Sequence, residues 1–360
     1  MTALGARGPG GGWRRRYGDA VPEALRARIA AVTAHLPSRY RTMEEIRARI
    51  AATGGYAPPP GLLEDLTGVR GVHVHEEGEN ASDLAVTAAR QALDEAGLKI
   101  GDVDLLLFAS TAQDLIEPAT SHLVAAKLGA TCPVFDVKNA CNSVLNAMEV
   151  ATSFIEAGRY RTVLIACGEP ATLATRWHAP DRQTLLRALP GYTASDAGAA
   201  MILTAGPAGD GDSGVLSLRF ASNSAAWEAC TVAGGGSMHH LSVHDDHTTL
   251  RLNGDLRQGA LDALPRILET AAEELGAVSS CAFVAFHQIA MPQYRETLEM
   301  FGLPEDRCMP AVAEHGNCAA ASLPLQLTKA VRADRIERGD LVAMIGLASG
   351  FSFGLALVRW

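Results

Sequence analysis

Residues 133–158 read PVFDVKNACNSVLNAMEVATSFIEAG, and the spacing of their apolar residues predicts a strand, a tight turn and a helix. The strand ends near Val137, and the helix ends at Gly158. Cys141 lies where the helix begins. Free N–H groups and the positive dipole end at a helix N-terminus favour a thiolate, so we expect Cys141 to have a lowered pKa and to act as a nucleophile. The pattern by itself fits a buried, inert cysteine equally well.

The strands around this stretch recur after a nearly constant interval, which predicts one architecture used twice. The segment DLLLFAS (104–110) aligns with CAFVAFH (281–287) at a lag of 177 residues. The segment RTVLIACG (161–168) aligns with GDLVAMIG (339–346) at a lag of 178. Short apolar runs that alternate with helices are typical of strands buried on both faces, so we expect an α/β fold built from two similar halves.

A further pair of strands locates an insertion in the first half. GAAMILT (198–204) aligns with GLALVRW (354–360) at a lag of only 156 residues, 22 fewer than the pair before it. We expect the extra residues, at about 171–192, to form a cap. The organisation predicted on this basis is a Gly- and Arg-rich flexible tail over 1–24, an N-terminal half over 25–208 and a C-terminal half over 209–360.

The repeat brings two further polar residues to the edge of the sheets where Cys141 lies. His287 ends the strand CAFVAFH, at the carboxyl end of a strand, where sites in α/β proteins are generally built. Asn317 aligns with Cys141 at a lag of 176 residues. A loop histidine and an N-cap asparagine are the simpler interpretations of these two residues taken singly. Together the three supply a nucleophile, a proton carrier and a neutral donor, which acyl-thioester chemistry needs.

Composition excludes several classes of function. The chain has 360 residues, is 48% hydrophobic and carries a formal charge of −9, so a nucleic-acid partner is not expected. Neither an apolar run long enough to span a membrane nor a signal peptide is evident, and we expect a cytoplasmic protein. The seven cysteines show no CxxC spacing, which argues against a disulfide framework or a zinc site.

Three polar features are expected to have structural rather than catalytic roles. The histidine-rich segment 238–249, MHHLSVHDDHTT, is expected to be a surface loop, and no metal site is predicted. Glu169 and Asp196 lie at strand ends near the expected site, where capping or turn roles account for both residues.

Several motifs together resemble the ketoacyl-ACP synthase III branch of the thiolase superfamily over nearly all of residues 28–360. They are 66–97, 135–151, FVAFHQIAMP (283–292), HGNCAAASLPLQL (315–327) and the terminal GDLVAMIGLASGFSFGLALVRW (339–360). The resemblance implies a thiolase fold, which has five layers, αβαβα, and two pseudo-repeated halves. It also implies an acyltransferase that forms carbon–carbon bonds by Claisen condensation.

The same resemblance implies roles for individual residues. Cys141 is acylated, while His287 and Asn317 hold the thioester carbonyl or enolate of the second substrate. The oxyanion of the first acyl group is held by backbone N–H groups of Cys141 and of Ser349, which lies in a Gly-rich turn with Gly350. Leu347 stands where decarboxylating relatives usually have a phenylalanine beside the malonyl group.

Glu117 differs from the residue that decarboxylating relatives have at its position, and this difference bears most on the reaction. In DLIEPATSH (114–122) it occupies a position where decarboxylating relatives commonly have a phenylalanine that crosses the dimer interface. OleA-type thiolases, which join two acyl-CoA chains without decarboxylation, carry a glutamate there and deliver it from the neighbouring subunit. An acyl thioester must lose an α-proton to a base, a step that loss of CO2 from malonyl makes unnecessary. A solvated loop glutamate is the alternative interpretation of Glu117.

The resemblance does not determine whether coenzyme A or an acyl-carrier protein carries the acyl groups. Leu62 and Leu66 replace the tryptophan and arginine that grip the adenine of coenzyme A in bacterial relatives, although Arg70 of the TGVR motif is present. We therefore expect acyl-CoA or acyl-ACP substrates, no cofactor, and a homodimer in which the Glu117 loop crosses the interface. The sequence favours non-decarboxylative condensation to a β-keto acyl product. Decarboxylative condensation with a malonyl-type extender, acyl transfer to an alcohol or amine, and an inactive subunit of a heterodimer stay open as alternatives.

Overall fold

A computed structural model describes residues 24–209 and 213–360 of the chain. The tail predicted over 1–24 therefore lies outside the described residues, apart from Ala24.

The first half is built on a five-stranded sheet whose strand order is β1-β7-β6-β4-β5. Strands β4, β5 and β6 run parallel to one another, and β7 pairs with both β6 and β1 in the antiparallel sense. The strands comprise β1 (Leu25–His35), β4 (Leu105–Ala109), β5 (Val134–Val137), β6 (Thr162–Glu169) and β7 (Ala197–Pro207).

A four-stranded sheet in the second half repeats this arrangement in the order β8-β13-β12-β11. β11 is parallel to β12, whereas β13 is antiparallel to both β12 and β8, as their counterparts are in the first sheet. The predicted repeat is confirmed, because each aligned pair of segments occupies an equivalent place. The strands comprise β8 (Gly214–Ser222), β11 (Phe283–Phe286), β12 (Leu341–Ala348) and β13 (Ser352–Arg359).

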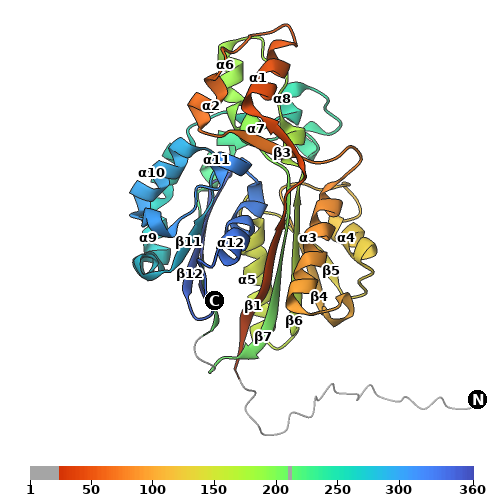
Figure 1. The fold of residues 1–360 in the computed structure, drawn as a ribbon, viewed down its shortest axis with the longest axis vertical. Coiled ribbons are helices and arrows are strands. Elements are labelled where there is room, and N and C mark those ends of the chain that lie inside the picture. The colour runs from red at the N-terminus through yellow and green to blue at the C-terminus, as the bar shows by residue number, and fades with distance from the viewer. Residues whose placement is uncertain (1–23, 210–212) are drawn as a thin grey trace, which may run out of the picture.

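The sheets and helices form the five layers expected of the thiolase fold (Figure 1). Helix α3 packs on the outer face of the first sheet, α5 and α12 lie between the two sheets, and α9 covers the outer face of the second sheet. The main helices of these layers are α3 (Ala81–Ala96), α4 (Thr120–Leu128), α5 (Ser143–Glu156), α9 (Leu256–Ala277), α10 (Met291–Phe301) and α12 (Ser322–Arg332).

The apolar pattern of the chain accounts for the central layer. The apolar stripe of α5 is buried, and its residues pack into a core that both sheets share. Helix α12 also faces both sheets, and most of its residues are buried. Burial of this much apolar surface is the dominant favourable term in holding the two halves together. The buried residues of the α5 stripe are Val144, Met148, Ala151 and Ile155.

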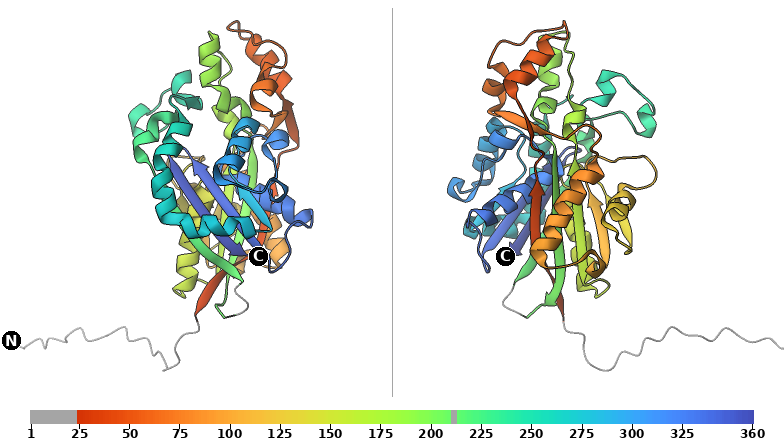
Figure 2. Two further views of the ribbon diagram at one scale, coloured as in Figure 1. Left: turned by 90° about the vertical axis from the view of Figure 1, so that its left-hand side faces the viewer. Right: turned by 45° about the vertical axis from the view of Figure 1, so that its right-hand side comes forward.

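Above the sheets lies a cap that is assembled from segments far apart in the chain (Figures 1 and 2). The insert predicted at about 171–192 contributes η2 (Ala171–Ala174), α6 (Arg182–Arg187) and most of α7 (Leu189–Thr193). Helices α6 and α7 pack with α1 and α2 around one apolar cluster. The other cap segments are β2 (Arg39–Thr42), α1 (Met43–Ala51), α2 (Leu62–Thr67), β3 (Gly71–Val74) and α11 (Val312–His315).

Shorter elements complete the described chain. The connection between β8 and α9 contains η3 (Ser224–Ala229), β9 (Cys230–Thr231), η4 (Ser237–His239), α8 (Asp245–Thr248) and β10 (Arg251–Leu252). Single 3-10 turns lie at η1 (Ile100–Asp102), η5 (Val278–Ser280), η6 (Glu305–Arg307) and η7 (Ala319–Ala321). Within the described ranges, every helix is too short or too polar to cross a lipid bilayer.

Candidate active site

The Cys141 turn joins β5 to α5 through a strained backbone. Ala140 adopts a φ of 45°, a left-handed conformation that is uncommon for residues other than glycine. Ser143 stabilises the turn, since its Oγ accepts a hydrogen bond from the N–H of Asn139 at 2.9 Å and donates to the carbonyl of Ala140 at 2.7 Å. The turn thereby presents Cys141 ahead of the first residue of α5.

The Asn317 turn in the second half also follows a residue with a positive φ. Gly316 has a φ of 67°, and the N–H of Asn317 donates to the carbonyl of Thr193 at 2.7 Å. The side-chain Oδ1 of Asn317 accepts the N–H of Ala319 at 2.9 Å. This local cap fixes the orientation of the amide and, within the described chain, leaves the Nδ2 hydrogens free to donate to a ligand.

His287 lies immediately beyond β11 and is held by the sheet. Its backbone N–H donates to the carbonyl of Ile345 at 2.9 Å, and its side chain is buried. Burial lowers the pKa of His287 to about 4, so the imidazole is neutral at physiological pH. A neutral imidazole carries one N–H donor, which suits the stabilisation of a developing negative charge.

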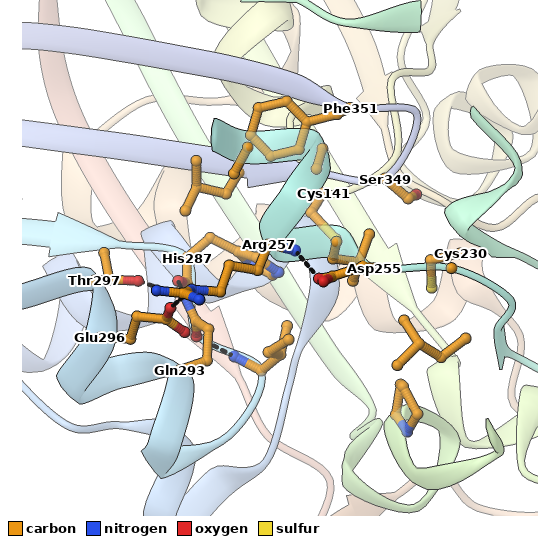
Figure 3. A pocket seen from close by; sticks show the side chains of 18 of the residues that line it. Cys141, Cys230, Asp255, Arg257, His287, Gln293, Glu296, Thr297, Ser349 and Phe351 are labelled. Atoms are coloured by element: carbon orange, nitrogen blue, oxygen red, sulfur yellow. Dashed lines mark hydrogen bonds and ion pairs between the residues drawn. The ribbon is translucent and has the colours of Figure 1, made fainter. Parts of the chain in front are cut away.

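The three residues predicted from the sequence line one cavity of about 750 Å³. Figure 3 shows Cys141 and His287 entering this cavity from different elements, with Ser349 and Phe351 near Cys141. Its walls are mainly apolar and come from α6, α9, α10 and the β12–β13 turn. They include Leu186, Leu250, Leu264, Ile267, Met300 and Phe301.

The predicted pKa of Cys141 is corrected by the structure. Burial raises the pKa of its thiol, and the charge of an ionised Glu169 raises it further. Cys141 precedes Asn142, the N-cap residue of α5, and so lies outside the first helical turn. The effect of the dipole falls off within that turn and is typically about 0.3–1 kcal/mol, less than the penalty for burying a charged thiolate. The thiol is therefore the favoured form.

The β12–β13 turn brings the residues of the predicted oxyanion site next to the Cys141 turn. Ser349 and Leu347 line the cavity, and Gly350 has a φ of 104° that allows the tight reversal. Asn142 holds the two turns together by donating from Nδ2 to the carbonyl of Ser352 at 3.0 Å.

Two predicted residues are not brought to this cavity within one chain. Glu117 is exposed on the loop between β4 and α4 and is absent from the described lining of the cavity. The side chain of Arg70 is 66% exposed and lies 3.8 Å from the carboxylate of Glu314, also outside that lining.

Glu169, for which the sequence suggested only a capping or turn role, is buried close enough to Cys141 to raise the pKa of its thiol. Glu169 ends β6, is fully buried and accepts a hydrogen bond from the N–H of Thr111 at 2.8 Å. The sequence does carry one signal for this position. Glu169 ends an apolar strand of the same sheet as the strand that precedes Ser110, so both residues lie at the carboxyl edge of that sheet. Asp196 is also fully buried, and it pairs with His75 at 2.6 Å.

Side chains of the histidine-rich segment 238–249 form ion pairs and ring contacts with one another and with neighbouring arginines. Asp246 forms ion pairs with Arg176 and Arg251, and the rings of His239 and His247 stack at 3.8 Å.

Comparison with known families agrees with this arrangement. Residues 135–224 match the model of 3-oxoacyl-[acyl-carrier-protein] synthase III, and residues 271–360 match the model of its C-terminal part. A β-ketoacyl-[acyl-carrier-protein] synthase III of Rhodospirillum centenum is 33% identical over 339 residues, with 93% of this chain and 99% of the relative covered. The chain belongs to this family. The Xylella fastidiosa enzyme of the same name is 31% identical, with 88% and 99% covered.

Solved structures extend the likeness to the whole fold. OleA of Xanthomonas campestris, in a cysteine-to-serine variant with bound lauric acid and lauroyl-CoA, superposes with a TM-score of 0.82 at 25% identity. The alignment covers 93% of this chain and 99% of that one. The 3-oxoacyl-(acyl carrier protein) synthase III of Xanthomonas oryzae superposes with a TM-score of 0.80 at 27% identity, with 93% and 99% covered. The protein is thus a thiolase-fold acyltransferase of the Claisen-condensing type.

Proposed function

We propose that this enzyme condenses two acyl thioesters without decarboxylation and that Glu117 of a partner subunit is the base. The supporting observation concerns the carboxylates of the cavity. Among its described lining residues only Asp255 and Glu296 are acidic. Asp255 caps α9, and Glu296 forms an ion pair with Arg257. Both are engaged, which supports a base for α-proton removal that a partner subunit supplies.

In the first half-reaction Cys141 takes the acyl group. The sulfur of Cys141 attacks the thioester carbonyl, the bond from that carbon to the carrier sulfur breaks, and the carrier thiol leaves with the proton of Cys141. Backbone N–H groups of Cys141 and Ser349 would stabilise the oxyanion. The strained turn at Ala140 supports this assignment, since strain of this kind is concentrated at functional sites.

In the second half-reaction a new carbon–carbon bond forms. Glu117 removes an α-proton from the second acyl thioester, and the enolate oxygen accepts hydrogen bonds from His287 and from Nδ2 of Asn317. The α-carbon attacks the carbonyl carbon of acyl-Cys141, the carbon–sulfur bond breaks, and the proton held by Glu117 returns to the thiolate. The product is a β-keto acyl thioester, and the sequence of steps requires no cofactor.

The apolar cavity supports acyl chains as substrates. Each buried methylene contributes about 0.8 kcal/mol, so a chain that fills the walls around Leu264 and Met300 would be strongly favoured over a short one. Lauroyl-CoA bound to an OleA variant supports a chain of this kind on a thioester carrier. OleA has also been solved with its glutamate or its histidine substituted. These residue types match Glu117 and His287.

A homodimer would bring Glu117 to the second site. β5 is an edge strand of its sheet, and Phe135 on it is 38% exposed. Leu115 and Ile116, beside Glu117, are 48% and 64% exposed. An edge strand next to exposed apolar side chains is suited to pairing with a second copy of the chain.

The test is mass spectrometry of products formed from acyl-CoA alone or from acyl-CoA with malonyl-CoA. We expect coupled product from acyl-CoA alone, loss of that product in Glu117→Ala, and loss of all product in Cys141→Ala. Coupling that requires malonyl-CoA would overturn the non-decarboxylative proposal. Coupling by Cys141→Ala would overturn the role of the nucleophile.

A further inference from the structure

Glu169 is a buried carboxyl group for which the condensation described above has no use. It lies at the carboxyl end of β6, fully removed from solvent, and its charge acts on the thiol of Cys141. Burying a carboxylate without a cation is unfavourable, so its retention beside a nucleophile calls for a physical reason.

The surroundings of Glu169 contain donors but no cation. Within the described chain, no Lys, Arg or His side chain forms an ion pair with it. Burial raises the pKa of its carboxyl to about 7 despite several hydrogen bonds that favour the charged form. The charged form of Glu169 is stabilised by hydrogen bonds from Thr111, Ser110 and the N–H of Ala320. The same charge raises the pKa of three neighbouring thiols, those of Cys141, Cys167 and Cys318.

Glu169 also anchors the first residue of the Glu117 loop, residues 111–119. Its Oε1 accepts the N–H of Thr111 at 2.8 Å, and its Oε2 is hydrogen-bonded to the hydroxyl of Thr111. Both carboxylate oxygens are thus committed to the point where the loop leaves β4. At the other end of the loop, the carboxylate of Asp136 accepts the N–H of Thr120 at 3.0 Å.

A second set of hydrogen bonds connects this anchor to the nucleophile. Ser110 donates from Oγ to the carbonyl of Gly168 at 2.7 Å, which ties the ends of β4 and β6 together. Ser143, which closes the Cys141 turn, has its Oγ 3.3 Å from the carbonyl of Ser110. The loop that carries Glu117 and the turn that carries Cys141 therefore share one buried polar support.

We infer that Glu169 is a positioning residue that serves both half-reactions, holding the Glu117 loop through Thr111 and setting the charge next to Cys141. An ionised Glu169 opposes a thiolate on Cys141, and a neutral one does not. The loop function rests on the proposed role of Glu117, whereas the charge function rests only on Cys141.

The two functions are separated by Glu169→Gln and Thr111→Val in the full-length enzyme. The glutamine keeps the size of the side chain and a carbonyl acceptor for the N–H of Thr111, but removes the charge. Thr111→Val removes the hydroxyl and keeps the carboxyl group. Glu274→Gln is the matched control, because Glu274 is a buried carboxylate paired with Arg219, away from the cavity lining.

The charge function is measured by the pH dependence of iodoacetamide alkylation at Cys141, with the labelled peptide quantified by mass spectrometry. We expect Glu169→Gln to alkylate up to about tenfold faster than wild type at pH 8, equivalent to about one pKa unit for Cys141. Glu274→Gln is expected to match wild type. A Glu169→Gln profile that coincides with that of wild type would overturn the charge function.

The loop function is measured by separating acylation from coupling. We expect Thr111→Val to form acyl-Cys141 at the wild-type rate, seen in the intact protein mass, but to release coupled product about tenfold more slowly. Glu169→Gln should retain coupling within about threefold, because it keeps an acceptor for Thr111. Normal coupling by Thr111→Val would overturn the loop function. Failure of the role of Glu117 would instead appear as normal coupling by Glu117→Ala.

Discussion

Ala140 and Gly316 directly precede the aligned residues Cys141 and Asn317, and both have a positive φ, of 45° and 67°. Each directly precedes a polar residue of the cavity, Cys141 in one half and Asn317 in the other. These two turns bring Cys141 and Asn317 to one cavity, because the two halves pack with the turns at the same end of their sheets.

This relationship predicts different responses to substitution. Gly316→Ala should destabilise the fold by about 1–3 kcal/mol, because φ is positive and the new Cβ would lie 2.6 Å from the carbonyl oxygen of Thr193. Ala140→Gly should change stability by less than about 1 kcal/mol, since relief of strain offsets the added freedom of the unfolded chain. Urea unfolding measures both, and a neutral Gly316→Ala would contradict the predicted strain.

Delivery of Glu117 from a partner predicts complementation. Glu117→Ala should reduce acyl-CoA coupling by about 10²- to 10⁴-fold, the usual contribution of general-base catalysis. Mixed dimers of Glu117→Ala and Cys141→Ala subunits should recover coupling, because one of their two sites combines intact Cys141 with intact Glu117. Product formation after the two variants are co-expressed and purified through different tags measures the recovery. A mixed dimer as inactive as its parents would show that Glu117 does not act across subunits.

The exposed apolar residues near β5 predict the interface. Phe135→Glu should give a monomer in light scattering, because it places a charge on the edge strand. Coupling should fall with the loss of the dimer, while the circular dichroism spectrum is retained. Leu216→Glu, at a residue that is 37% exposed on the edge strand β8 of the other sheet, is the control. Dimers that persist in Phe135→Glu would place the interface elsewhere.

The apolar wall of the cavity predicts control of chain length. Met300→Trp fills space between α9 and α10, so lauroyl-CoA should couple at least about tenfold more slowly while butyryl-CoA is nearly unaffected. Leu268→Trp, at a residue that is 48% exposed on α9, controls for the added bulk. Product yields against a series of chain lengths provide the measurement. Equal losses for both substrates would indicate disruption of the fold rather than a length limit.

Glu169 predicts a pH-dependent difference in stability. Its pKa is raised to about 7 from 4.5, so the folded protein binds more protons than the unfolded chain between these values. Wild type should therefore lose about 3 kcal/mol of stability, relative to Glu169→Gln, as pH rises from 4 to 8. Denaturant unfolding at several pH values measures this difference, with Glu274→Gln as reference. A constant difference across the range would mean that Glu169 does not titrate there.

The sequence by itself predicted the repeat and the group of Cys141, His287 and Asn317, which lines one cavity of the structure. The periods of apolar residues in strands and in α5 are set by local backbone geometry, so they can be recognised from the sequence alone. A constant lag between two halves then predicts which residues reach the same sheet edge. The reaction expected of these residues came from the family resemblance of the motifs around Cys141, His287 and Asn317.

The tertiary structure decided what depends on burial and on distant neighbours. The expected low pKa of Cys141 was wrong, because desolvation depends on every group packed around the thiol and outweighs the nearby helix end. The placement of Glu169 beside Cys141 likewise needs strands brought together from different parts of the chain. Residues 133–158 therefore determined where Cys141 lies, whereas only the folded chain decided the ionisation of its thiol and the hydrogen bonds that hold its turn.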